Sequence, residues 1–104
     1  MTGEAEITGI IGSVRLVRTY SAGVWLGIVE QKNGKEVVLN KARRLWKWKA
    51  VSGISLSSVA LFGIDESGSR IEPPVNGVWM EAVELIPCSN EAIDSIMGAR
   101  NAIQ

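Results

Sequence analysis

The sequence predicts a mainly β (α+β) domain: a small antiparallel sheet or barrel with one short helix and a C-terminal helix. Three observations predict it. Short apolar runs alternate with turn residues, Asn33-Gly34 lies between two such runs, and a helical apolar spacing begins after Ser89. A chain of 104 residues suits one domain. We therefore expect residues 1–104 to form a single domain, with 1–11 as a flexible or accessory N-terminal segment.

The first half of the chain reads as strands joined by turns. Residues 12–18 and 24–32 are the first two predicted strands, and 19–23 is a tight connection of small residues with a glycine. Asn33-Gly34 predicts a type I′ hairpin, because that turn needs positive φ at both central positions. The returning strand is predicted at 36–39.

After a predicted turn at 40–43, the sequence alternates as a short strand over 44–49. With a period of two, Arg44, Trp46 and Trp48 share one face of that strand. A short helix is predicted at 55–63, because a serine begins it and a glycine follows its end.

The rest of the second half holds a loop, a strand and a helix. Residues 65–76 read as a loop in which Pro73-Pro74 is unsuited to the middle of a sheet. The strand predicted at 78–86 loses its alternation, which indicates a β-bulge near Ala82 or an oligomer contact. The helix after Ser89 is predicted to run past Gly98, from the spacing of Ala92, Ile93, Ile96, Met97 and Ile103.

The charges of the chain balance but are unevenly distributed. The formal net charge is zero, which disfavours nucleic acid as a partner. Residues 1–64 carry nine basic and four acidic side chains, whereas 65–104 carry two basic and seven acidic ones. The two halves are expected either to compensate each other within one fold or to pair with a second copy of the chain.

The residues that are missing exclude most enzymes. The chain has no histidine and one cysteine, Cys88, so it lacks the usual groups for acid–base catalysis, for nucleophilic triads and for zinc or iron sites. We expect no catalytic residue, no metal and no cofactor. The acidic N-terminus and the lack of a long apolar stretch predict a cytoplasmic protein with no membrane partner.

Two segments are candidates for ligand binding. Residues 41–49 interleave basic and aromatic side chains, which suit phosphate groups and nucleobases. Residues 18–24 combine an arginine with hydroxyls around a glycine, a composition that can bind an anion. Both have structural alternatives: core tryptophans on a lysine-rich edge strand, and an ordinary turn. The candidate residues are Arg18, Thr19, Ser21, Gly23, Arg43, Arg44, Trp46 and Trp48.

Several runs also carry a family resemblance. VRTYSAGV at 17–24, GKEVVL at 34–39, ARRLWKW at 42–48, SLS at 55–57 and VELIPC at 83–88 together resemble a widespread family of small, uncharacterised tailed-phage (prophage) proteins. The resemblance covers roughly residues 14–97. The chain departs from the pattern at 49–54 and in its extra N-terminal residues, which affects the shape of any pocket near Trp48.

The resemblance implies a phage origin and a bacterial cytoplasm. Because small non-enzymatic phage proteins often counter host immunity, the first hypothesis is a homo-oligomer that sequesters a cyclic or other small nucleotide signal, by analogy of class. The alternatives are a protein-interaction or virion accessory protein with no small ligand and, less favoured, a nucleic-acid-binding domain.

Overall fold

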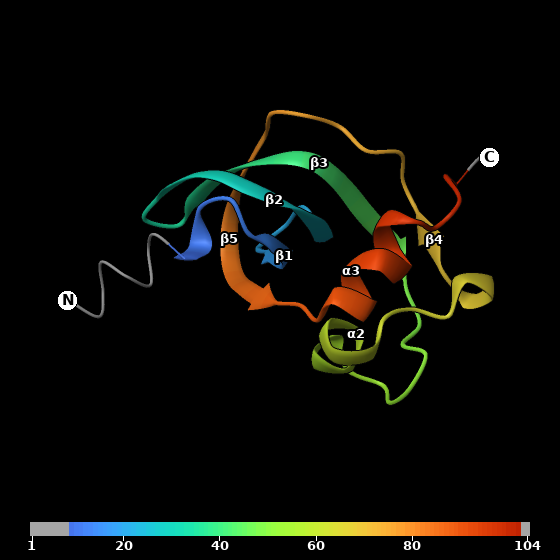
Figure 1. Ribbon diagram of the computed structural model, residues 1–104. Coiled ribbons are helices and arrows are strands. Elements are labelled where there is room, and N and C mark those ends of the chain that lie inside the picture. Colours follow the sequence, from blue (N-terminus) through green and yellow to red (C-terminus); the bar gives the residue numbers. More distant parts are fainter. Residues whose placement is uncertain (1–8, 103–104) are drawn as a thin grey trace.

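In the computed structural model, which describes residues 9–102, five antiparallel strands form one sheet accompanied by two short α-helices (Figure 1). The mainly β prediction is confirmed. The segment predicted at 1–11 lies mostly outside the described residues. The elements are β1 (Val14–Thr19), β2 (Val24–Asn33), β3 (Glu36–Lys47), α2 (Leu56–Phe62), the 3-10 turn η1 (Glu66–Gly68), β4 (Arg70–Ile71), β5 (Val78–Pro87) and α3 (Asn90–Met97).

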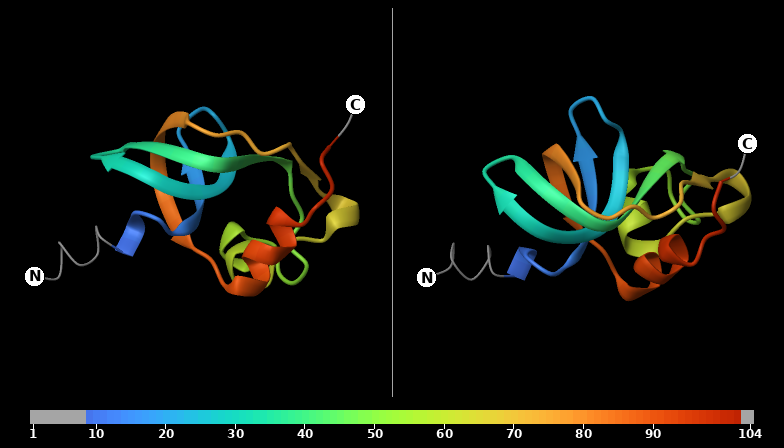
Figure 2. Two further views of the ribbon diagram at one scale, coloured as in Figure 1. Left: turned by 45° about the horizontal axis from the view of Figure 1, so that its top comes forward. Right: turned by 90° about the horizontal axis from the view of Figure 1, so that it is seen from above.

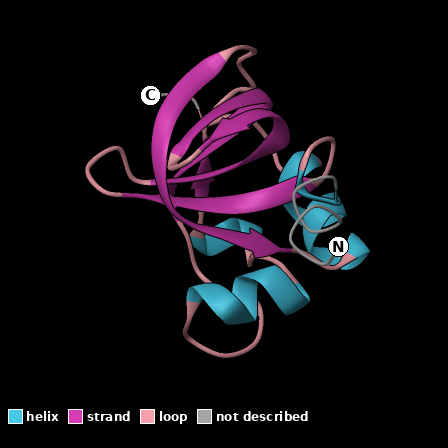
Figure 3. Cartoon of the chain, turned by 90° about the vertical axis from the view of Figure 1, so that its left-hand side faces the viewer, coloured by secondary structure: helices cyan, strands magenta, loops and turns pink. Residues whose placement is uncertain are grey.

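Four of the strands close into a ring. The order β2-β1-β5-β3 is completed because β3 also pairs with β2, so each of these strands has a neighbour on both sides. The long, curved β3 pairs with β2 and β5 and, at its far end, with the two-residue β4. Figure 2 shows the strands curling around one another, Figure 1 shows α2 and α3 beside each other, and Figure 3 shows the helical segments outside the sheet.

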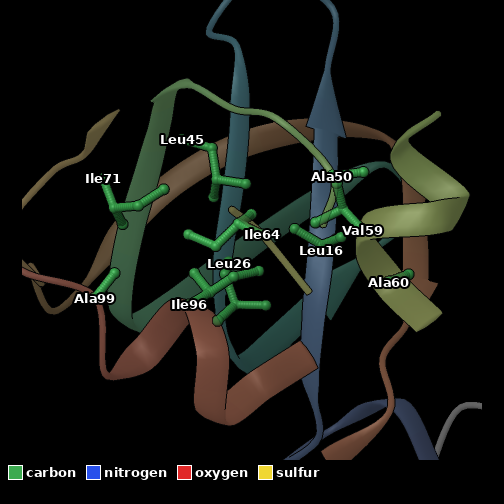
Figure 4. Packing of buried hydrophobic residues seen from close by; sticks show 10 residues of the cluster. All are labelled: Leu16, Leu26, Leu45, Ala50, Val59, Ala60, Ile64, Ile71, Ile96 and Ala99. Atoms are coloured by element: carbon green, nitrogen blue, oxygen red, sulfur yellow. The ribbon is translucent and has the colours of Figure 1, made fainter. Parts of the chain in front are cut away.

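The buried residues form two clusters on opposite faces of the strands. Val17 points into the ring, where side chains from all four of its strands meet: Val17, Val29, Val37, Leu39, Ala42 and Met80. Its neighbour Leu16 points outward to the second cluster, between the ring and the helices (Figure 4). Since both residues are fully buried, β1 lies between two cores, and this explains its continuous apolar centre.

The predicted turn at 40–43 is wrong, because β3 continues through it. Lys41 has a φ of 49°, and Lys41 and Ala42 together lie opposite Gly27 of β2. This is a β-bulge, which bends the strand without ending it. A Cβ at Gly27 would lie 3.2 Å from the Cα of Ala42, so the close approach of β2 and β3 depends on glycine there.

The hairpin between β2 and β3 is confirmed, but its turn type is not the predicted one. Asn33 pairs with Glu36, so the two loop residues are Gly34 and Lys35. Gly34 has a φ of 61° and no positive φ occurs at Lys35. Positive φ at the first loop position alone fits a type II′ turn and excludes type I′.

Both helices are confirmed, and the second is shorter than predicted. Ser55 caps α2, and Gly63 follows its end with a φ of 94°. Ser89 caps α3, which ends at Met97 with Gly98 as the C-cap. The apolar spacing therefore continued past the true end of the helix, and Ile103 lies outside the described residues.

The segment 65–76 is more structured than the predicted loop. It contains η1 and β4, and the outer edge of β4 is covered by the C-terminal residues, where Ile71 bridges to Asn101 and accepts a hydrogen bond of 2.8 Å from the Ala102 amide. A two-residue strand is too short to produce an alternating pattern. The predicted bulge in β5 is confirmed near Ala82, because the register with β1 shifts between Glu84 and Ala82.

Two ion pairs join the basic half of the chain to its acidic half. Arg18 Nε lies 2.7 Å from Glu84 Oε1, and Lys49 Nζ lies 3.8 Å from Asp65 Oδ2. Part of the charge asymmetry is therefore compensated within one fold. Among the described residues, no helix has the length and apolar character needed to cross a membrane.

Candidate functional site

Arg43 is a buried structural residue. Its side chain is on the helix side of β3, and the residue is only 2% exposed. Its guanidinium reaches the end of α3, where helix carbonyls have no partners within the helix. Nη1 donates to the carbonyls of Ile96, Met97 and Ala99, Nη2 to Asn101 Oδ1 and the carbonyl of Ile71, and Nε to the carbonyl of Glu72.

These contacts correct the prediction that Arg43 binds a ligand. A guanidinium has five N–H donors, and the protein already provides acceptors for all three nitrogens of Arg43. Burial lowers the pKa of the Arg43 guanidinium, and the nearby charge of Glu66 opposes that shift. The group stays a cation, because an arginine pKa lies far above neutral. Arg43 therefore holds the C-terminal segment to the sheet.

Arg44, the next residue, lies on the opposite face of β3 and has a different environment. Its guanidinium carbon lies 4.7 Å from the centre of the Trp25 ring, within the range of a cation–π interaction. Its Nε is the one buried side-chain nitrogen or oxygen in residues 9–102 that has no hydrogen-bond partner. An unsatisfied donor of this kind is unusual in a folded protein and needs an explanation.

Arg44 and Trp25 line a shallow hollow of about 320 Å³, whose other lining residues are Glu72, Pro73 and Val75; we call it the Trp25–Arg44 hollow. Val75 is held there by two backbone hydrogen bonds with Ala42, of 2.8 and 2.9 Å. Trp25 is fixed by the hydrogen bond that its indole N–H donates to the Ala22 carbonyl. The aromatic ring and the loop therefore form a defined wall around the Arg44 guanidinium.

Sequence reasoning missed Trp25 and the three loop residues. Trp25 lies within an apolar strand, where an indole is expected in the core. Pro73 and Val75 come close to Arg44 only because the loop after β4 folds back onto β3. One weak signal for the loop was the adjacent pair Pro73-Pro74, which indicated a rigid extended segment.

Arg18 does not join this hollow. In an antiparallel pair, residues that lie opposite each other point to the same face. Val17 pairs with Trp25, whereas Arg18 pairs with Val24, so Arg18 and Trp25 leave opposite faces of the sheet. The side chain of Arg18 pairs instead with Glu84. The two predicted binding segments therefore do not merge into one pocket around Arg18.

The Thr19–Gly23 segment is a turn whose polar groups are largely used internally. The Thr19 hydroxyl donates to the Gly23 carbonyl at 2.7 Å and accepts from the Ala22 amide at 2.8 Å. Gly23 is exposed and has a φ of 86°, which the turn requires. Ser21 is exposed on the same turn. The structural alternative for this segment therefore accounts for Thr19 and Gly23.

The two tryptophans at the end of β3 differ in exposure. Trp46 is 64% exposed and lies two residues beyond Arg44. Trp48 is half-buried and packs against the cluster between the ring and the helices. Of these two indoles, Trp46 presents more surface on which a planar ligand can stack.

The remaining chemistry is sparse. No group of three metal-ligating His, Cys, Asp or Glu side chains occurs within residues 9–102. Cys88 is half-buried, and its burial raises the pKa of the thiol, which makes it a poor nucleophile at neutral pH.

The fold and the hollow together define a small β-ring domain with an arginine–tryptophan surface site. The family described as Domain of unknown function (DUF6948) matches residues 12–96, so the chain belongs to that family. No curated protein and no solved structure matches the chain. The resemblance to phage proteins stays a prediction.

Proposed function

We propose that this domain is a non-enzymatic binding protein that holds a small nucleotide in the Trp25–Arg44 hollow. The observation that carries the proposal is the Arg44 side chain, which is stacked on an indole and makes no hydrogen bond or ion pair with any of residues 9–102. The buried Nε does not itself reach a ligand, but the two Nη groups also have no partner among residues 9–102, and a guanidinium fixed in this way suits a phosphate group because its planar fork matches phosphate oxygens.

The hollow limits the size and orientation of the ligand. A volume of about 320 Å³ is at the low end of the range for small-molecule sites, so it suits one nucleotide unit. The carboxylate of Glu72 repels phosphate but accepts hydrogen bonds from base or ribose donors. The phosphate is therefore assigned to Arg44, the donor groups of the nucleoside to Glu72, and stacking of the base to the exposed Trp46.

The biological role follows from the phage resemblance and from the lack of catalytic side chains. A binding protein of this kind acts by lowering the free concentration of its ligand. In a bacterial cytoplasm, a phage protein that holds a cyclic nucleotide signal would counter host immunity, and as a homo-oligomer it would bind several copies of the signal.

Substitution of Arg44 tests this function directly. Cyclic mono-, di- and trinucleotides and cyclic ADP-ribose isomers are screened by thermal shift, and binding is measured by titration calorimetry. Arg44→Gln is expected to weaken binding at least about tenfold, since a charge-assisted hydrogen bond contributes roughly 1.5–3 kcal/mol. Trp46→Ala should weaken it less, by the stacking contribution.

Arg18→Gln is the matched control, because it removes the same charge from the opposite face and should leave ligand affinity unchanged. A panel in which no nucleotide raises the melting temperature would contradict the proposal. Equal losses in the Arg44 and Arg18 variants would show that only the general charge of the domain matters. Native mass spectrometry of the same samples reports the oligomeric state.

A second candidate function is protein interaction without a small ligand. Large apolar side chains are exposed on α2 and on the loop before it: Val51, Ile54, Leu61 and Phe62. Ile54 is 95% exposed. Detection of the protein in purified phage particles, together with a negative nucleotide panel, would favour a virion accessory role.

A further inference from the structure

A second hollow, separate from the Trp25–Arg44 hollow, lies where β3, β4, η1 and the C-terminal segment meet. Its volume is about 680 Å³, roughly twice that of the first. Its charged lining residues are Lys47, Arg70, Arg100 and Glu66, and we call it the Lys47–Arg70 hollow. Figure 1 shows η1, β4 and the C-terminal end of the chain close together at this end of the molecule.

The strand register places two cations opposite each other in this hollow. Lys47 of β3 pairs directly with Arg70 of β4. Like charges in this position destabilise an antiparallel pair. Neither side chain forms an ion pair or a hydrogen bond with any other residue in the described part of the chain, and both line the hollow. Their arrangement is therefore unfavourable for the protein alone and favourable once an anion lies between them.

Among the described residues, the lining has a single carboxylate, that of Glu66, and it is already engaged. Glu66 Oε2 accepts a hydrogen bond of 2.8 Å from the Arg100 amide and lies 3.6 Å from Arg100 Nε. Glu66 therefore compensates Arg100 and leaves the charges of Lys47 and Arg70 unbalanced. This excess of positive charge distinguishes the hollow from an ordinary surface network, in which acidic and basic side chains alternate.

Neutral donors complete the lining. Asn101 accepts from Arg43 through Oδ1, which fixes its amide and leaves Nδ2 without a protein partner in residues 9–102. The buried Arg43 thus positions one donor of the hollow while it holds the end of α3. The lining therefore combines two cations with a neutral donor in a hollow of about 680 Å³.

We infer that the Lys47–Arg70 hollow binds the di- or triphosphate group of a small molecule. Two opposed cations match a chain of phosphates better than a single phosphate, because each side chain then contacts a separate charged group. An inorganic polyphosphate and a nucleotide share this oligophosphate group, and the inference concerns the group in either compound.

Titration calorimetry with inorganic tripolyphosphate and with adenosine triphosphate, at low ionic strength and without divalent metal, tests the inference. Both should bind, and rising salt should weaken binding. Equal affinities for tripolyphosphate and adenosine triphosphate would show that the hollow recognises the phosphates alone. Tighter binding of adenosine triphosphate would show that the hollow also contacts the nucleoside. Lys47→Gln and Arg70→Gln should each raise the Kd about tenfold.

Two controls separate binding from structure. Lys35→Gln removes a lysine at the far hairpin and should bind both phosphate compounds like the wild type. Without ligand, the melting temperature of Lys47→Gln should stay equal or rise, because the repulsion with Arg70 is relieved.

The inference is overturned if neither phosphate compound binds, or if the Lys47 and Arg70 variants bind as tightly as the wild type. A fall in the melting temperature of unliganded Lys47→Gln would also overturn it, by giving Lys47 a structural role. Binding of single-stranded DNA that tripolyphosphate does not displace would assign the surface to nucleic acid instead.

Discussion

At the scale of single residues, Arg43 and Arg44 show why neighbouring side chains of one type have different roles. The sequence marks both as cations beside tryptophans, and alternation along β3 sends them to opposite faces. Arg43 meets the carbonyls at the end of α3, whereas Arg44 meets an indole and solvent. Composition alone predicts a basic–aromatic segment but not which arginine is free, because that depends on where a distant helix ends.

Replacement of Arg43 by lysine tests its structural role. Lysine keeps the charge but cannot reach the separate acceptors that the guanidinium joins, so several buried carbonyls lose their partners. We expect a loss of about 3 kcal/mol in the free energy of unfolding, measured by urea denaturation. Arg44→Lys is the control and should change stability by less than about 1 kcal/mol. Equal losses would contradict the role assigned to Arg43.

At the scale of elements, local signals predicted most of the strands and helices, and tertiary contacts set their limits. Ser55 and Gly63 define α2 because capping is chemistry between near neighbours. The length of β3 was not predictable, since residues 40–43 resemble a turn and become a bulge only when β2 packs against them. β4 was missed for a related reason, because two residues form a strand only beside β3.

Gly63 offers a test of how α2 and α3 fit together. A Cβ there would lie 2.8 Å from the side chain of Ser95 in α3, and the φ of 94° is unfavourable for other residues. Gly63→Ala should lower the free energy of unfolding by about 2–4 kcal/mol.

Gly23→Ala is a matched control, because Gly23 also has a positive φ but has open space around its Cβ position. Gly23→Ala should lower the free energy of unfolding by about 1–2 kcal/mol, because only the unfavourable backbone conformation contributes. If thermal and urea denaturation gave the same loss for both variants, the contact between Gly63 and Ser95 would not limit helix packing.

At the scale of the whole molecule, the ring brings the basic and acidic halves of the chain together. The balance of charge was visible in the sequence, but the particular pairs depend on the fold. Of the predicted site residues, the structure leaves Arg44 in a hollow and Trp46 exposed, while it places Arg18 on another face and buries Arg43. The sequence identified the correct segment for a candidate site, but the four strands that fold around one another decide which of its side chains are accessible.

The carboxylate of Asp65, which lies beside Ser67 and Lys49, makes stability depend on pH. A hydrogen bond from the Ser67 side chain lowers the pKa of Asp65, with further lowering by Lys49. Since the folded-state pKa is depressed, this stabilisation is present above the unfolded value of about 3.9 and is lost as pH falls through the folded value.

Asp65→Asn should therefore be less stable than the wild type at neutral pH, and the difference should shrink in acid. Urea midpoints measured across that range check the expectation. Asparagine still caps η1, so the fold is preserved in the variant. A difference that stayed constant with pH would show that the charge of Asp65 has no role.

Asn101 and Ala102 cover the outer edge of β4 and so protect it from contact with other molecules in a crowded solution. The closed ring leaves few unpaired backbone groups on its strands, and the C-terminal residues occupy the outer side of β4. Uncovered, those amides and carbonyls would be open to strands of other molecules, which is how folded domains begin to aggregate. The hydrogen bonds of Arg43 thus help to keep each copy of the protein from polymerising with the next.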